Sequence, residues 1–259
     1  MADTPEKERK GSMKLPTKRK DIPSPSIDGD MFLIIGEPKA GKSTFVNQVP
    51  DSLVIDTQSG HSKLGGCVLD LREAGADPLA TFGEVLSQLQ KDCPYQAVAI
   101  DTLDDLSVMA EELATQRCNV KLNMKETGVG QFPHGIGWVT HREIVMTMLT
   151  KIRALPCTTI LVAHNKRMID EETSEVSKVL DLPGKLAHWV PGEVDHIAIA
   201  SRSKKKGYTL SFEGYEHERS GKKTIMQAGS RLKALNGKVI ETSWAALLEA
   251  VKGGSDGSA

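Results

Sequence analysis

Short apolar runs alternate with longer amphipathic segments through most of the chain. The apolar runs, each long enough for one buried strand, lie at residues 32–35, 53–56, 97–101 and 159–163. The segments that repeat apolar residues with a helical period begin after residue 41 and recur at 79–91, 103–117 and 139–155. Strands that alternate with helices are typical of a parallel sheet with crossover helices. The pattern therefore predicts an α/β fold.

The helix expected at residues 139–155 has one continuous apolar stripe, formed by Val145, Met148, Leu149, Ile152 and Leu155. Such a stripe at helical spacing indicates a face packed on the core rather than a cofactor site. The pair Thr140 and Glu143 has the spacing of a capping box, which predicts that this helix begins near residue 140.

The pattern changes from about residue 194. Apolar stretches at 194–201, 208–212 and 224–227 predict an antiparallel C-terminal extension of the sheet. A final helix is expected at 244–251, with Thr242 and Ser243 as candidate N-caps.

Composition divides the 259 residues into one domain and two tails. Residues 1–28 are rich in Lys, Glu, Pro and Ser, and such a segment buries too little apolar surface to fold. We expect a mobile basic tail there, a solvated tail being favoured over a nucleic-acid arm. Residues 29–252 are expected to form one domain, and the Gly- and Ser-rich residues 253–259 a flexible tail.

The net charge of −1 excludes a protein whose whole surface attracts nucleic acid, so any basic face is local. The four cysteines lack C-x-x-C spacing, which argues against a zinc site and a disulfide framework. No apolar run approaches the roughly 18 residues of a membrane span. We expect a cytoplasmic protein without a membrane partner.

Residues 36–44 read GEPKAGKST and match every fixed position of a phosphate-binding loop, G-x-x-x-x-G-K-[ST]. Such a loop turns successive backbone N–H groups toward phosphate oxygens, at the positive end of the following helix. Lys42 is expected to reach the β- and γ-phosphates, Ser43 to bind Mg²⁺, and Thr44 with the loop amides to hold the α- and β-phosphates. The predicted nucleotide-binding residues are Gly36, Glu37, Pro38, Lys39, Ala40, Gly41, Lys42, Ser43 and Thr44.

The strand at residues 97–101 ends in Asp101, one βα unit after the loop. This is the place of a Walker B aspartate, which holds Mg²⁺ opposite Ser43. An aspartate that merely starts a helix is the alternative interpretation. Thr102, Asp104 and Asp105 are expected to lie at the start of the next helix, where they cap it and place negative charge at the positive end of its dipole. Either aspartate could instead orient a water molecule.

The loop, the pair Asp101–Thr102 in AIDTLDDL, the strand ILVAHNK and the later DLPGKL resemble the RecA-like P-loop ATPases. Within that family the chain is similar to phage nucleotide-binding proteins that include single-strand annealing ATPases. If a phage encodes it, the resemblance implies the host cytoplasm as its location. The resemblance covers roughly residues 30–235. It implies a RecA-like P-loop NTPase fold, with a mostly parallel central sheet and helices on both faces.

The resemblance also implies the catalytic residues Lys42, Gln58, Asp101 and His164. The family commonly has a glutamate after the second strand, where this chain has Gln58. A glutamine orients water but cannot take its proton, so we expect hydrolysis either to be slow or to rely on another residue. His164 follows the strand expected beside Asp101 and is a candidate sensor of the γ-phosphate, or a histidine that simply leaves a core strand.

RecA-like ATPases build the site between subunits, so the resemblance implies a homo-oligomer, either ring or filament. A Lys or Arg of a neighbour then reaches the γ-phosphate, and the candidates here are Lys204, Lys205, Lys206, Arg231 and Lys233. The family's DNA-contacting loop corresponds to residues 166–187, where four acidic residues between 170 and 175 disfavour a nucleic-acid backbone. The glycine-rich residues 128–138 offer Phe132 and Trp138 for base stacking, or for packing on the domain.

Three functions remain open. The leading hypothesis is a Mg²⁺-dependent ATPase that acts on single-stranded DNA in phage-type recombination or annealing. The alternative is a nucleotide-gated protein-interaction factor in replication or assembly, with weak hydrolysis. A small-molecule kinase is the third, although the chain lacks an evident arginine-rich lid.

Overall fold

The computed structural model describes residues 26–61, 65–169, 176–219 and 222–253. The tails expected at 1–28 and 253–259 therefore lie almost wholly outside the described residues. The strands are β1 (Met31–Gly36), β2 (Ser52–Asp56), β3 (Cys67–Asp70), β4 (Ala97–Asp101), β5 (Thr158–Ala163), β6 (Asn165–Ile169), β7 (Val176–Leu180), β8 (His196–Ser203), β9 (Gly207–Ser211), β10 (Tyr215–Arg219), β11 (Lys222–Met226), β12 (Gly229–Ser230) and β13 (Val239–Glu241). The helices are α1 (Lys42–Val46), α2 (Pro78–Lys91), α3 (Leu103–Leu122), α4 (Ile136–Arg153), α5 (Leu186–Glu193) and α6 (Trp244–Lys252), with 3₁₀ turns at Val129–Gln131 and Pro133–Gly135.

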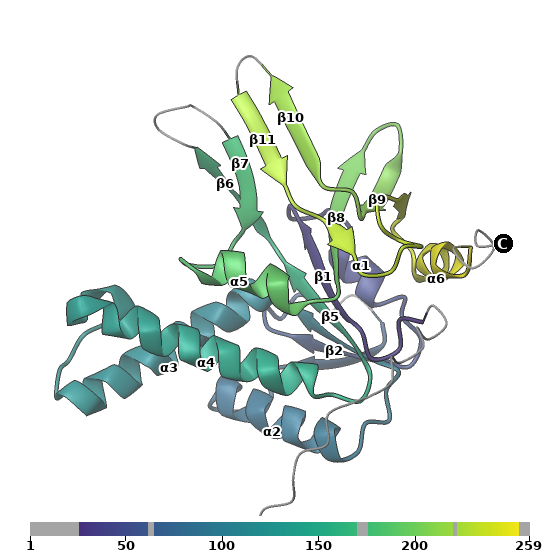
Figure 1. Cartoon of the computed structure of the whole chain (residues 1–259). Helices are drawn as coiled ribbons and strands as arrows, with labels where there is room; N and C mark the ends of the chain where they lie inside the picture. Colours follow the sequence, from purple (N-terminus) through teal and green to yellow (C-terminus); the bar gives the residue numbers. More distant parts are fainter. Residues whose placement is uncertain (1–25, 62–64, 170–175, 220–221, 254–259) are drawn as a thin grey trace, which may run out of the picture.

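The described residues form a nine-stranded central sheet in the order β13-β9-β8-β1-β5-β4-β2-β3, with β12 paired to β8 (Figure 1). The six strands from β8 to β3 are parallel. The strands β9, β12 and β13 run antiparallel to their neighbours. The expected α/β fold, with a mostly parallel sheet and antiparallel C-terminal strands, is confirmed.

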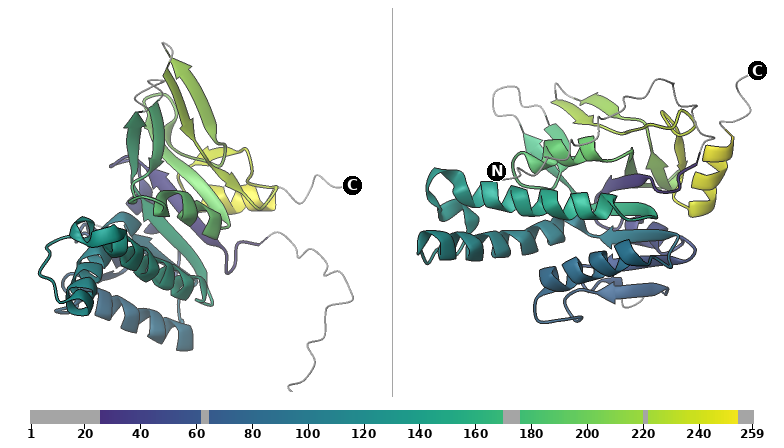
Figure 2. Two further views of the ribbon diagram at one scale, coloured as in Figure 1. Left: turned by 60° about the vertical axis from the view of Figure 1, so that its left-hand side comes forward. Right: turned by 60° about the horizontal axis from the view of Figure 1, so that its bottom comes forward.

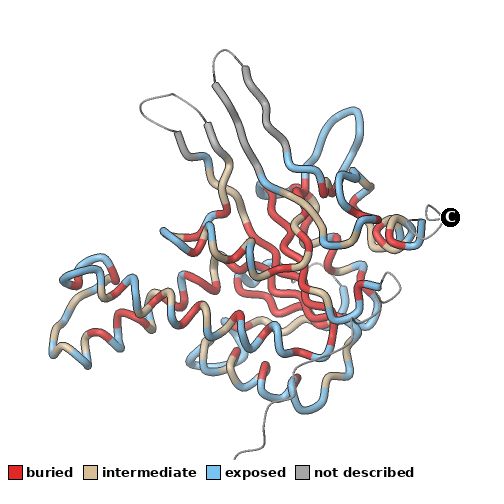
Figure 3. The backbone as a smooth tube through the Cα atoms, viewed as in Figure 1, coloured by how far each residue is buried: buried red, intermediate tan, exposed pale blue. Residues whose placement is uncertain are grey.

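The middle of the sheet is covered on both faces, which explains why its strands read as continuous apolar runs. All residues of β1, β4 and β5 are buried (Figure 3). One apolar cluster joins the sheet to α2, α3, α4 and α5, and a second joins it to α1 and α6. Figure 2 shows α2, α3 and α4 together on one side of the sheet and α6 on the other.

The C-terminal part differs from the expectation in two places. The expected strand at 194–201 is β8, and it pairs in parallel with β1, so it belongs to the parallel core rather than to the extension. Residues 224–227 fall largely in β11, which pairs with β10 outside the central sheet. Two hairpins, β6–β7 and β10–β11, stand beside each other at one end of the molecule, and β7 contacts β11 (Figure 1).

Helix starts were predicted with mixed success. Thr102 caps α3 by accepting a hydrogen bond from the backbone N–H of Asp105, and Ser243 caps α6 in the same way. The capping box at Thr140 was wrong, because α4 begins one turn earlier, at Ile136 after Gly135. Its apolar stripe does pack on the core, as expected.

Candidate nucleotide site

The phosphate loop, residues 36–44, connects the carboxyl end of β1 to α1, and two of its glycines are required by their surroundings. A Cβ at Gly36 would lie 2.5 Å from the backbone oxygen of Ala200, an approach that no side chain tolerates. Gly41 has φ +90°, and a Cβ there would lie 2.9 Å from the ring of Tyr208. The loop therefore curls tightly against β8 and β9, and within it the backbone N–H of Ala40 donates to the carbonyl oxygen of Glu37 at 3.2 Å.

Lys42 is buried inside this loop. Its Nζ donates hydrogen bonds to the carbonyl oxygens of Gly36 at 2.8 Å and of Glu37 at 2.9 Å. Burial lowers the pKa of Lys42, while the carboxylates of Asp101, Asp104 and Glu37 oppose that shift. Phosphate oxygens arriving at the loop would give this ammonium group stronger partners than two carbonyls.

Asp101 lies at the carboxyl end of β4, beside Asp56 on β2, and it is buried. Its Oδ2 is 2.9 Å from Nε2 of His61, whose side chain is also buried. The hydrogen bond to Asp101 raises the pKa of His61, against the opposing effect of burial. Among the described residues Nδ1 of His61 has no hydrogen-bond partner. His61 was not predicted as a site residue.

Asp56 fixes the loop that carries both His61 and Gln58. Its two carboxylate oxygens accept hydrogen bonds from the backbone N–H groups of Gln58 and His61, each at 2.8 Å. The side-chain amide of Gln58 donates instead to Asp105 and to the hydroxyl of Thr102, at the start of α3. Gln58 thus lies at the expected end of β2, but its amide is bound to α3 and not to the phosphate loop.

His164 follows β5, which pairs with β4 as the predicted strand order required. Its Nδ1 lies 2.7 Å from Oδ2 of Asp104, and its backbone N–H donates to Oδ1 of the same carboxylate at 2.9 Å. Burial alone would raise the pKa of Asp104, but the bonds with His164 outweigh it and the pKa is lowered. Asp104 therefore fixes both the ring and the backbone of His164 at the edge near Lys42.

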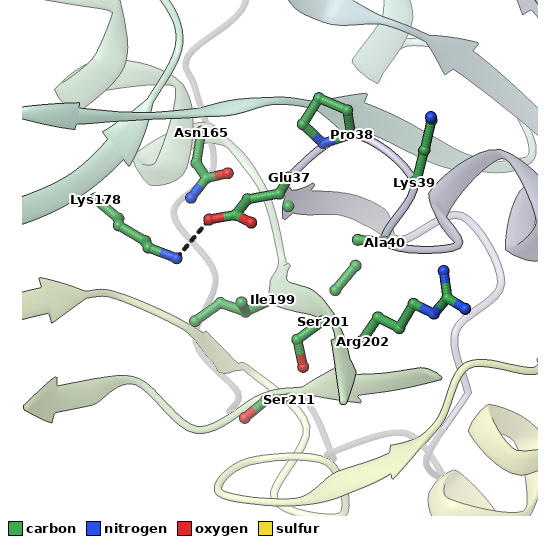
Figure 4. A pocket seen from close by; sticks show the side chains of 12 residues that line it. Glu37, Pro38, Lys39, Ala40, Asn165, Lys178, Ile199, Ser201, Arg202 and Ser211 are labelled. Carbon is green, nitrogen blue, oxygen red and sulfur yellow. Dashed lines mark hydrogen bonds and ion pairs between the residues drawn. The ribbon is translucent and has the colours of Figure 1, made fainter. Parts of the chain in front are cut away.

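A cavity of about 450 Å³ opens beside the phosphate loop, on the side of β6, β7 and β8 (Figure 4). Lys178 of β7 reaches across to Glu37 of the loop, with Nζ 2.9 Å from Oε1. Arg167 of β6 lies 4.0 Å from the same carboxylate, and the pKa of Glu37 is lowered chiefly by its bond with Lys178. These contacts join the β6–β7 hairpin to the loop.

The oxygen donors fit a Mg²⁺ ion that is held together with a nucleotide. Ser43 offers a hydroxyl and Asp101 a carboxylate, which are hard ligands of the kind Mg²⁺ prefers. In the part of the chain that the structure describes, no group of three or more His, Cys, Asp or Glu side chains could hold a metal ion by itself. Phosphate oxygens and water would therefore complete the coordination.

The residues predicted to stack on bases or to reach a neighbour's γ-phosphate lie in different parts of the fold. Phe132 is buried in the domain, whereas Trp138 at the start of α4 is 43% exposed. Lys204, Lys205 and Lys206 are exposed at the turn between β8 and β9. Arg231 binds Asp195 at 2.6 Å. The four acidic residues between 170 and 175 lie outside the described residues.

The family described as AAA domain matches residues 28–232. No curated protein matches the chain. Among solved structures, a KaiC-like protein from the hyperthermophilic archaeon Pyrococcus horikoshii OT3 is similar, with 11% sequence identity and a TM-score of 0.41; the match covers 82% of this chain and 84% of that one. Within the described residues, no helix combines the length and the apolar character needed to cross a membrane.

Proposed function

The chain belongs to the AAA domain family, and from that premise we propose that it is a Mg²⁺-dependent ATPase that acts on single-stranded DNA as a homo-oligomer, in recombination or annealing. The observation that carries the ATPase part is the buried Lys42 inside a phosphate loop, near the carboxylates of Asp101 and Asp104. The DNA part rests on the resemblance to phage annealing ATPases.

In the proposed reaction each residue has a distinct role. The loop amides and Lys42 bind the phosphates, and Ser43 with Asp101 holds Mg²⁺. The ion would neutralise the charge that develops on the transferred phosphoryl group. His164, fixed by Asp104, acts as a hydrogen-bonding sensor of the γ-phosphate. Gln58 orients the attacking water once its amide leaves Asp105, and because it cannot accept the water's proton we expect slow turnover.

The contacts of Glu37 support coupling of nucleotide state to a partner. An incoming triphosphate repels the Glu37 carboxylate and attracts its partner Lys178. Since Lys178 belongs to β7 and Asn165 begins β6, a change at the loop is transmitted directly to the β6–β7 hairpin. That hairpin belongs to the segment that corresponds to the DNA-contacting loop in RecA-like ATPases.

Phosphate release by the full chain tests the proposal, measured with and without Mg²⁺ and single-stranded DNA over a range of salt concentrations. We expect DNA to stimulate hydrolysis, and ATP to increase particle size in light scattering. Lys42→Ala removes both effects, whereas Lys91→Ala, which changes an exposed lysine at the end of α2, retains them. If DNA alters neither hydrolysis nor assembly at any salt concentration, the DNA part of the proposal is wrong.

The bound amide of Gln58 favours one second candidate, a nucleotide-gated protein-interaction factor with weak hydrolysis. In that case ATP binding changes the hairpins but turnover stays slow with or without DNA. Rapid turnover by the isolated chain, abolished by Lys42→Ala, would exclude this candidate.

A further inference from the structure

A second cavity, of about 410 Å³, lies between the start of α4 and the connection from β7 to α5. The helix contributes Trp138, Val139 and Arg142 to its lining, and the connection contributes Pro183 and Lys185. Figure 1 shows α5 beside α4, at the base of the β6–β7 hairpin. None of the residues of the candidate nucleotide site lines this cavity, so a separate role is open to it.

The walls of this cavity combine exposed apolar side chains with unpaired positive charge. Trp138 is 43% exposed and Val139 is 40% exposed. Among the described residues, the side chains of Arg142 and Lys185 make no hydrogen bond or ion pair, and no carboxylate lines the cavity. An exposed apolar surface next to two unpaired cations suits an occupant that carries carboxylates and some apolar surface.

The chain itself has a segment with that chemistry. Residues 170–175 read DEETSE, so four of these six residues are acidic. They connect β6 to β7 and lie outside the described residues. Each glutamate has two methylene groups that can contact an apolar wall below its carboxylate. The same carboxylates repel a nucleic-acid backbone, so they favour a protein surface that offers cations.

Backbone geometry keeps this segment away from the cavity of its own chain. In the β6–β7 pair, Ile169 lies opposite Val176 and Asn165 lies opposite Leu180. Each strand has five residues and spans about 14 Å from its first Cα to its last. The segment leaves the Ile169–Val176 end, whereas the cavity follows the Leu180 end. Six residues held at both ends extend about 12 Å at most, which is too short to return along the hairpin.

We propose that residues 170–175 of one copy bind in this cavity of a neighbouring copy, with carboxylates against Arg142 and Lys185 and glutamate methylene groups against Trp138. The inference rests on the proposed function, because it supplies a contact for the homo-oligomer proposed there. The two surfaces in contact are different, so the arrangement is head-to-tail. Repetition of such a contact closes a ring or extends a filament.

A fluorophore-labelled peptide with the sequence of residues 169–176 tests the contact directly, through the change in its anisotropy when the full chain is added. We expect the peptide to bind, and the double variant Arg142→Glu and Lys185→Glu to raise its Kd about tenfold. A peptide in which the four acids are replaced by their amides should also bind about tenfold more weakly. Lys91→Glu is the matched control, because it reverses an exposed charge at the end of α2, and it should leave the Kd unchanged. Equal binding of the acidic and the amide peptide would overturn the proposal.

Light scattering of two charge-reversed variants tests the contact in the assembled protein, with Mg²⁺ and ATP present. One variant carries Arg142→Glu and Lys185→Glu, and the other carries Glu171→Lys and Glu172→Lys. Each variant alone should assemble poorly, because like charges then meet at the contact. An equimolar mixture should assemble again, because the acidic segment of the first variant matches the cavity of the second and the reverse. Restoration by mixing also shows that both variants fold.

The outcomes separate this inference from the proposed function. If both variants assemble as the unmodified chain does, or if the mixture does not restore assembly, the assignment of this cavity is wrong and the homo-oligomer stands. If the unmodified chain stays monomeric with and without ATP, both the homo-oligomer and this inference are wrong. If the cavity variant loses binding of a single-stranded oligonucleotide while its assembly is unchanged, the occupant is a nucleic acid and the inference is overturned.

Discussion

Replacing His61 by alanine removes the one side-chain hydrogen bond that the buried carboxylate of Asp101 makes among the residues that the structure describes. The two side chains are 3% and 5% exposed and their atoms are 2.9 Å apart, so water screens the contact little. A hydrogen bond to a charged group contributes about 1.5–3 kcal/mol, and removing one partner of a buried pair costs more. We expect His61→Ala to lower the free energy of unfolding by about 3 kcal/mol at pH 7.

Urea unfolding of the free chain, followed by circular dichroism, measures this loss. Asp101→Asn and the double variant complete a double-mutant cycle, which isolates the pair from the packing of the imidazole ring. We expect a coupling energy of about 2 kcal/mol. If Mg²⁺ and ATP bind as proposed, the ion supplies a new positive partner for Asp101, so their addition should reduce the cost of His61→Ala. A coupling energy below about 0.5 kcal/mol would refute the reasoning, because additive effects are expected of independent sites.

Three further predictions concern other parts of the site and core. Gly36→Ala places a Cβ 2.5 Å from the backbone oxygen of Ala200, so we expect the free energy of unfolding, measured in urea, to fall by about 2–3 kcal/mol and ATP to bind more weakly. If neither quantity changes, the loop is not packed as tightly as described. Asp104→Asn weakens the hold on His164, so kcat for ATP hydrolysis should fall with KM unchanged; a change in KM alone would argue against the sensor role. Burial lowers the pKa of His141, so the stability that this residue contributes is present above its unfolded pKa near 6.5 and is lost as pH falls through the lower folded value. The free energy of unfolding should therefore change less between pH 7 and pH 5 in His141→Asn than in the unmodified chain. An equal change in both proteins would contradict the lowered pKa.

The hydrophobic pattern alone was sufficient to predict the central strands β1, β4 and β5. These strands are buried on both faces, so nearly all of their residues are apolar. The same pattern did not predict β3, a short edge strand with no buried residue. It also did not predict the β6–β7 hairpin, whose residues are mostly polar. Parallel strands at an edge and hairpins at the surface have weak hydrophobic patterns, so periodicity does not detect them.

The site was predictable where it depends on local sequence and unpredictable where it depends on distant contacts. The phosphate loop and Asp101 follow from residues next to their strands. The position of His61 depends on the hydrogen bond that its backbone N–H donates to Asp56. The direction of the Gln58 amide depends on Asp105, which belongs to α3 and is distant in sequence. The one available signal was the polar run after β2, which places several hydrogen-bonding side chains beside the end of β4.

The central place of β1 in the sheet has a consequence for how the protein is made. Met31 pairs with Thr159 on one side, and Phe32 with His196 on the other, so the strand that leads into the phosphate loop finds its neighbours only after most of the chain exists. Contacts between residues so far apart in sequence form slowly. During synthesis the apolar β1 therefore stays unpaired until β5 and then β8 have left the ribosome, and until then it is exposed to aggregation. We therefore expect the phosphate loop at the end of β1 to reach its folded position late in synthesis.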